Sequence, residues 1–131
     1  MEKKKVIIHV NDMAGWMKMF TGLDNFLNDV GQEKAEVCVV VNGPGVCGCP
    51  TAINLENNAQ ALAKCGSNRP EKLMVQVREL HARGVTFIAC RNALRKHFIT
   101  EDMIESVFVL VNSSITEMIE RQQEGYAYIK M

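Results

Sequence analysis

The stretch VTFIACRNALRKHF, residues 85–98, joins an apolar run directly to a segment of helix-forming residues. Residues 85–89 are mostly β-branched or aromatic, which is typical of a strand covered on both faces. No turn residue separates this run from residues 90–98, so the strand should lead straight into a helix at Cys90. A strand followed at once by a helix is the unit from which parallel α/β sheets are built.

The same unit recurs along the chain. Strands are predicted over residues 6–10, 37–41, 85–89, 107–111 and 126–130. Helices are predicted from residue 14 to 30, from 50 or 51 to 65, from 70 to 83, from 90 to 98 and from 113 or 114 to 124. Because crossovers between parallel strands must cover the sheet, this order predicts a three-layer α/β/α sandwich with a mainly parallel five-stranded sheet. We expect one domain over residues 1–131.

The composition narrows the classes of partner and compartment. Fifteen basic and fifteen acidic side chains give a formal charge of zero, so we expect neither nucleic acid nor an anionic membrane as a partner. The first apolar run, residues 6–10, is too short for a signal peptide or a membrane span. Five cysteines without an export signal indicate a reducing cytoplasm. Structural disulfides are therefore not expected.

Chemistry in parallel α/β sheets gathers beyond the carboxyl ends of the strands. The residues predicted at that edge are Asn11, Asp12, the loop 42–49, Cys90 and residues 112–114. In the loop, Gly43, Gly45 and Gly48 have the G-x-G-x-x-G spacing of a dinucleotide-binding turn. However, two predicted helices and a break follow before any strand, and Pro50 indicates that the first helix starts after the third glycine. We therefore interpret this segment as a flexible loop rather than a dinucleotide site.

Cys90 is the leading candidate for chemistry. At the junction of strand and helix, its sulfur should face unpaired N–H groups and the positive end of the helix dipole. Arg91, Arg95 and Lys96 add positive potential, and such a setting lowers a thiol pKa and favours the nucleophilic thiolate. The alternative is that Cys90 is a small apolar residue that ends a buried strand.

The segments around Cys90 resemble the DsrE/DsrF-like family of small sulfur-handling proteins. The resemblance rests on GVTFIACRNALR, on VFVLVNSSITEMIERQQEGYAYIKM and on the opening KVIIHVND, and its most specific parts are Cys90 with Asn92 and the ending QQEGYAYIK. It implies a parallel α/β sandwich whose subunits assemble into homo- or hetero-oligomers, and we expect a homo-oligomer such as a trimer or a hexamer. It also implies that Cys90 carries sulfur as a persulfide between donor and acceptor proteins.

Other residues are assigned supporting roles. If the loop lies beside Cys90, Cys47 or Cys49 could resolve a persulfide or disulfide on Cys90, and the loop would then be mobile. The same three thiolates with His9 or Cys65 could instead bind zinc, or an iron–sulfur cluster if all ligands are cysteines. Candidate binding residues are Asn11, Asn92, Ser113 and Ser114, the two serines also being ordinary helix caps. Cys38 is assigned to the core.

These observations predict a cytoplasmic sulfur-relay protein that uses Cys90 and requires no cofactor or resident metal. The second hypothesis is a non-enzymatic module that binds a metal or a partner protein through the loop that contains Cys47 and Cys49. The two hypotheses differ in what the purified protein should contain, and metal analysis with an absorption spectrum would distinguish them.

Overall fold

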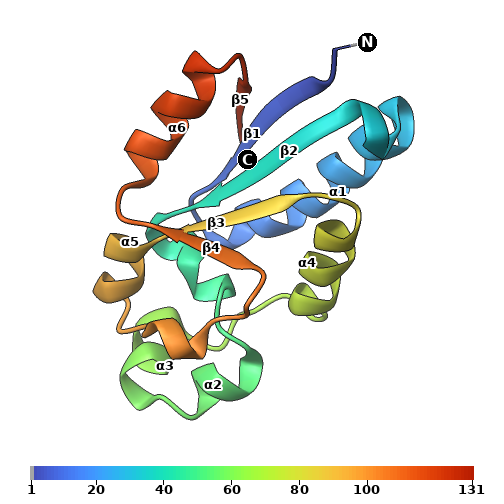
Figure 1. Ribbon diagram of the computed structural model, residues 1–131. Coiled ribbons are helices and arrows are strands. Elements are labelled where there is room, and N and C mark those ends of the chain that lie inside the picture. Colours follow the sequence, from blue (N-terminus) through green and yellow to red (C-terminus); the bar gives the residue numbers. More distant parts are fainter. Residues whose placement is uncertain (1) are drawn as a thin grey trace.

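The computed structural model describes residues 2–131 and contains one five-stranded sheet in the order β4-β3-β2-β1-β5 (Figure 1). All four strand pairings are parallel, as the recurring strand–helix unit predicts. The strands are β1 (Lys4–Val10), β2 (Ala35–Val41), β3 (Thr86–Cys90), β4 (Phe108–Val111) and β5 (Ala127–Lys130). The short β5 lies at an edge of the sheet, where an alternating final strand was expected.

Helices cover both faces of the sheet, which confirms the three-layer α/β architecture. The α-helices are α1 (Met13–Val30), α2 (Ala52–Glu56), α3 (Ala59–Cys65), α4 (Leu73–Ala82), α5 (Arg91–Lys96) and α6 (Ser114–Gln123). Three short 3₁₀ helices join them, η1 (Gln32–Lys34), η2 (Gly43–Gly48) and η3 (Glu101–Met103). In Figure 1, α1 and α4 lie on one side of the sheet and α6 on the other.

The alternation of side chains along β1 divides the core into two clusters. Val6, Ile8 and Val10 point into the larger cluster, which includes the apolar stripes of α1 and α4. Ile7 points the other way, into a smaller cluster with Met118 of α6. This period of two is what a strand between two covering layers requires. Cys38 is 1% exposed in the smaller cluster, so its assignment to the core is confirmed.

The junction between β1 and α1 forms as the sequence indicates. The Asp12 side chain accepts a hydrogen bond of 2.8 Å from the backbone N–H of Gly15, which satisfies one of the unpaired donors of the first helical turn. At the other end, α1 stops at Gly31, whose φ of 87° lies in a region that other residues rarely adopt.

Two helix boundaries differ from the sequence prediction. The single helix predicted from residue 50 or 51 to 65 is broken after Glu56, and the Asn58 side chain caps the second part by accepting from Ala61 N–H at 2.9 Å. The helix predicted from Pro70 begins at Leu73, because Lys72 has a φ of 57° that no helix interior tolerates. Over residues 2–131, no helix combines the length and the apolar character needed to cross a bilayer.

Candidate functional site

Cys90 lies at the carboxyl end of β3 and is the N-cap residue of α5. Its extended backbone, with φ −84° and ψ 119°, carries the chain from strand to helix without a loop. The register pairs Cys90 with Val111 of β4, so the sulfur lies beside the turn that leads into α6. Cys90 Sγ is 4.0 Å from the carbonyl oxygen of Asn112 in that turn.

Hydrogen-bond donors surround the Cys90 sulfur. The residue is only 6% exposed, and burial by itself would raise the pKa of the thiol. The backbone N–H groups of Ala93, Ser114 and Asn92 and the hydroxyl of Ser114 act in the opposite direction, because they donate to the charged sulfur. The donors outweigh the burial, so the pKa of Cys90 lies below the usual value for cysteine. A buried thiol therefore has a stabilised anionic form.

The basic side chains near Cys90 contribute less directly than the sequence suggested. Arg91 is paired with Glu101 at 3.4 Å and also donates to the side-chain oxygen of Asn112 at 3.2 Å. Arg95 donates to the side-chain oxygen of Asn92 at 3.1 Å. The pKa of Cys90 is lowered by hydrogen bonds from two helix N-termini, those of α5 and α6. The donors from α6 belong to Ser114, one of the candidate binding residues of the sequence.

A chain of hydrogen-bonded, partly buried polar side chains leads from β1 to Ser114. His9 Nδ1 lies 2.6 Å from the hydroxyl of Tyr128, and His9 Nε2 lies 2.7 Å from the side-chain oxygen of Asn42. The side-chain nitrogen of Asn42 donates to Ser114 Oγ at 3.0 Å. Asn42 was expected at this edge as part of the loop 42–49 and His9 only as a possible metal ligand, and the hydrogen bonds that join them to Ser114 were not predicted. A signal existed, because a polar residue inside the apolar run 6–10 must find a partner to be buried.

Cys47 is not available as a free thiol, because it forms a disulfide with Cys65. The expectation that the chain has no structural disulfide is therefore wrong. The Cα atoms of the two residues are 5.5 Å apart. The disulfide connects η2 to the end of α3. The segment that it closes contains the short helices α2 and α3.

Cys49 is buried, and its environment is that of a structural residue. It is 0% exposed, and this burial raises the pKa of its thiol, with only a smaller opposing effect from Arg69. Its carbonyl oxygen accepts from Glu105 N–H at 3.2 Å. A neutral, enclosed thiol is a poor nucleophile, so the geometry gives Cys49 no evident part in chemistry at Cys90.

The glycines of residues 42–49 make room for close packing. A Cβ on Gly45 would lie 2.9 Å from the carbonyl oxygen of Val10, and one on Gly48 would lie 2.6 Å from the ring of Trp16. The Trp16 indole N–H donates to the carbonyl oxygen of Gly45 at 2.8 Å. Residues 43–48 form η2, and residues 45–48 are buried. The glycine spacing thus reflects packing against the β1–α1 junction, consistent with the rejection of a dinucleotide turn.

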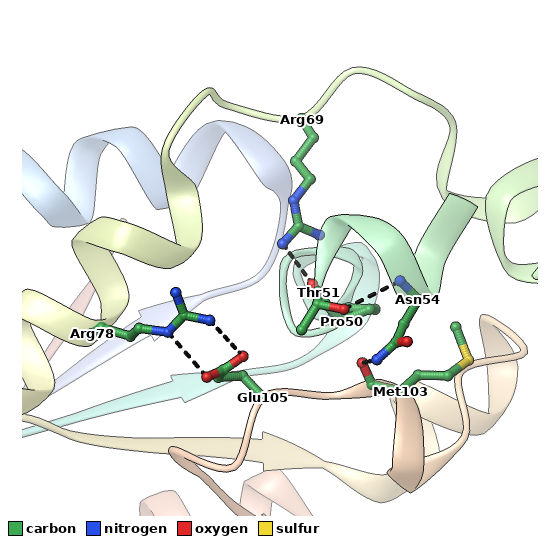
Figure 2. A network of polar contacts seen from close by, with 7 residues as sticks. All are labelled: Pro50, Thr51, Asn54, Arg69, Arg78, Met103 and Glu105. Carbon is green, nitrogen blue, oxygen red and sulfur yellow. Dashed lines mark hydrogen bonds and ion pairs between the residues drawn. The ribbon is translucent and has the colours of Figure 1, made fainter. Parts of the chain in front are cut away.

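The segment that follows η2 is held on both sides. The Arg69 guanidinium donates to the carbonyl oxygens of Cys47 and Pro50. Asn54 donates to the carbonyl oxygen of Met103 at 3.0 Å, on the side opposite Arg69 in Figure 2. The expectation of a mobile loop is therefore not met, since the disulfide, the arginine and the Met103 segment each fix it.

An ion pair whose arginine is exposed joins the neighbouring segment to α4. Arg78 of α4 forms two hydrogen bonds of 3.0 Å with the Glu105 carboxylate, just after η3 (Figure 2). Pro50 and Ile104 form an isolated antiparallel bridge between the two segments. The chain after η2 and the chain after η3 are thus paired.

The remaining candidate residues lie around the carboxyl edge with different roles. Asn11 accepts from Gly45 N–H at 3.0 Å through its carbonyl oxygen, and thereby supports η2. Asn92 is exposed and presents its backbone N–H to Cys90. Ser113 is the N-cap of α6, where its hydroxyl oxygen accepts from Thr116 N–H at 3.3 Å. Of the four residues, Asn92 and Ser114 supply hydrogen-bond donors that lower the pKa of Cys90.

Metal binding at these residues finds no geometric support. In the part of the chain from residue 2 to 131, no three His, Cys, Asp or Glu side chains are grouped so as to hold a metal ion. Cys47 and Cys65 are bonded to each other, and both nitrogens of His9 have hydrogen-bonding partners.

Comparison with known proteins agrees with the fold. The solved structure of a protein of unknown function, MTH1491 from Methanobacterium thermoautotrophicum, is similar, with a TM-score of 0.75 and 23% identity over 98% of this chain and 100% of that chain. No curated protein matches the sequence significantly. The model of the DsrE/DsrF-like family matches residues 11–131, a range that includes Cys90 and every polar contact described around it except those of His9. The chain therefore belongs to the DsrE/DsrF-like family.

Proposed function

We propose that this chain is a sulfur carrier in which Cys90 accepts sulfane sulfur and passes it to a partner thiol. Family membership supports a role in sulfur relay at the coarse level. The observation that carries the finer proposal is the set of donors around Cys90, with N–H groups from two helix N-termini and the hydroxyl of Ser114 directed at one sulfur. Such donors stabilise an anion, and the thiolate is the nucleophilic form of cysteine.

The proposed step is an exchange at sulfur with no net oxidation. The Cys90 thiolate attacks the outer sulfur of a donor persulfide, R–S–SH. The donor's S–S bond breaks, R–S⁻ leaves with the electron pair, and Cys90–S–SH is formed. An acceptor thiolate then attacks the outer sulfur and releases the Cys90 thiolate. Donors that stabilise the Cys90 anion also make it a better leaving group in this second step.

The position of Cys90 is compatible with sulfur delivery by a partner. The residue itself is 6% exposed, but Asn92 and Asn112 on either side of it are exposed. A persulfide places its outer sulfur one bond further from the backbone than the thiol does, so the reactive atom would lie nearer to the surface. We propose that donor and acceptor are proteins that present a thiol to this edge of the sheet.

We further propose that the protein acts in the cytoplasm as a homo-oligomer, a trimer or a hexamer. Large apolar side chains are exposed on and near α6, with Ile115 65%, Ile119 50% and Val109 53% exposed. A surface of this kind is suited to contact with another subunit. Light scattering coupled to gel filtration would measure the mass, and a monomer at micromolar concentration would contradict this part of the proposal.

The alternative function, a module that binds metal or a partner through Cys47 and Cys49, has no observation in its favour. Cys47 is bonded to Cys65 and Cys49 is enclosed, so the two thiols are not presented together.

The test is loading of the protein with polysulfide, followed by intact-mass and peptide-mapping mass spectrometry. We expect a reducible gain of one sulfur atom on the Cys90 peptide. Cys90→Ser should lose this gain, whereas Cys38→Ser, which removes another thiol that is free in the fold, should retain it. Sulfur that loads equally well on Cys90→Ser would overturn the assignment of the carrier.

A further inference from the structure

The polar side chains between β1 and α6 form one part-buried series of hydrogen bonds that ends at Ser114, whose hydroxyl is among the donors to the Cys90 sulfur. His9 is 8% exposed and Ser114 is 5% exposed, and Asn42 connects them with contacts of 2.7 Å and 3.0 Å. The three residues come from β1, the end of β2 and the start of α6, so the chain crosses neighbouring elements of the fold. Buried polar groups are retained at a cost in stability unless every member is satisfied, and here each has a partner.

The hydrogen bonds of this chain have a definite direction. Asn42 donates through its side-chain nitrogen to Ser114 Oγ, so its side-chain oxygen must accept, and the donor facing it is His9 Nε2–H. In the neutral ring, Nδ1 is then an acceptor, and the Tyr128 hydroxyl donates to it at 2.6 Å. Ser114 Oγ receives a hydrogen from Asn42 and keeps its own hydrogen for another acceptor.

Cys90 accepts from the Ser114 hydroxyl, which is among the donors that lower the pKa of its thiol. The register of β3 and β4 pairs Cys90 with Val111, and Cys90 Sγ lies 4.0 Å from the Asn112 carbonyl oxygen, which places the sulfur beside the start of α6. If the Asn42 amide were turned over, its oxygen would face Ser114 and take the hydroxyl hydrogen. Cys90 would then lose that donor. The orientation of the Asn42 amide therefore decides whether the Ser114 hydroxyl donates a hydrogen bond to the Cys90 sulfur.

We propose that His9 and Asn42 are positioning residues that hold the Ser114 hydroxyl with its hydrogen directed at Cys90 Sγ. The proposal rests on the function assigned to Cys90 and deepens it, since it names residues that act on the sulfur without touching it. His9 Nε2–H selects the orientation of the Asn42 amide, and the Asn42 amide selects the orientation of the hydroxyl. Tyr128, which is 42% exposed on β5, is the outermost residue of this series of hydrogen bonds.

The first experiment measures the pKa of Cys90 from the pH dependence of its alkylation by iodoacetamide, read on the Cys90 peptide. Ser114→Ala should raise this pKa by about one unit, because one donor to the anion is lost. Ser114→Thr, which keeps the hydroxyl, should restore the wild-type profile. Asn42→Leu should raise the pKa by a similar amount. Circular dichroism should show that the variants are folded.

A double-variant cycle distinguishes positioning from a general loss of structure. If Asn42 acts through Ser114, then Asn42→Leu combined with Ser114→Ala should shift the pKa no further than Ser114→Ala alone. His9→Gln, whose amide can still donate to Asn42, should stay closer to wild type than His9→Phe. An unchanged pKa in Asn42→Leu, or shifts that add in the double variant, would overturn the proposal.

A second measurement needs no variant. Nitrogen chemical shifts of the His9 ring in the wild-type protein should show a protonated Nε2 and a bare Nδ1, and the opposite tautomer would contradict the proposal. These readings do not involve sulfur transfer, so they are separable from the proposed function. A protein that shows the expected pKa shifts but takes up no sulfur on Cys90 would retain the positioning residues and lose the carrier role.

Discussion

Replacing Gly48 by alanine should destabilise the protein, because the added methyl group would enter the space of the Trp16 ring. A Cβ at this position would lie 2.6 Å from Trp16 Cε2 and Nε1 and 2.9 Å from Cζ2. Carbon atoms in favourable contact are about 3.5–4.0 Å apart. Trp16 cannot easily move away, since it is 0% exposed and its indole N–H is bonded to Gly45 at 2.8 Å.

The magnitude follows from two terms. Forcing extra volume into a packed core costs about 1–3 kcal/mol. Displacing the Trp16 ring would also weaken its hydrogen bond, which adds about 1 kcal/mol. The free energy of unfolding should therefore fall by about 2–4 kcal/mol. For a chain of this size the melting temperature changes by about 3–4 °C per kcal/mol, so Tm should fall by roughly 6–16 °C.

Thermal and urea unfolding followed by circular dichroism would measure this loss. Gly22→Ala is a matched control, because its Cβ would meet only the end of the Met131 side chain, 3.0 Å away, and alanine favours the interior of α1. The cost of Gly48→Ala should also shrink in a Trp16→Phe background, where the ring is smaller. A Gly48→Ala protein as stable as wild type would refute the account of η2 as a segment packed on Trp16.

Three further predictions concern the thiols and the hydrogen bonds by which Arg69 holds the segment beside the disulfide. Arg69→Met, which removes the donor to both carbonyl oxygens beside the disulfide, should lower the free energy of unfolding by roughly 1.5–3 kcal/mol in urea titrations. The control Arg78→Met, at an exposed residue, should change this free energy little. Equal losses in the two variants would contradict the stabilising role assigned to Arg69. Thiol titration in denaturant should count three free thiols before reduction and five after it, and five before reduction would contradict the disulfide. Iodoacetamide near neutral pH should modify Cys90 first, because its pKa is lowered whereas burial raises the pKa of Cys38 to about 11, and prior modification elsewhere would count against this order. The free thiols are Cys38, Cys49 and Cys90.

The fold could be predicted because its determinants are local. Runs such as residues 37–41 are apolar throughout, and the helix between Asp12 and Gly31 has a cap at each end. Each of these elements can therefore be predicted from its own residues. Where local signals were ambiguous, the prediction failed. The break after Glu56 depends on the capping side chain of Asn58, and the late start of α4 depends on the backbone of Lys72.

The site was predicted only in part, because its contacts join distant residues. Cys90 stands at a junction of strand and helix that is visible in the sequence. The Cys47–Cys65 disulfide depends on the path of two short helices across 18 residues, which no spacing rule specifies. The link from Asn42 to Ser114 spans 72 residues and exists only once the sheet is assembled.

The dependence of the Cys90 pKa on salt can distinguish two interactions that could stabilise the thiolate. One is attraction to the cations of α5, and the other is hydrogen bonding at contact distance. If the cations of α5 lowered the pKa of Cys90, screening should raise it, because the Debye length falls from about 30 Å at 0.01 M salt to about 3 Å at 1 M. Hydrogen bonds from Ala93, Ser114 and Asn92 act at contact distance, where salt ions cannot enter. We therefore expect the alkylation pKa to stay constant over this range, and Arg95→Gln to leave it unchanged. If the pKa of Cys90 rose by roughly half a unit or more with salt, the surrounding arginines and lysine would instead be the groups that lower it.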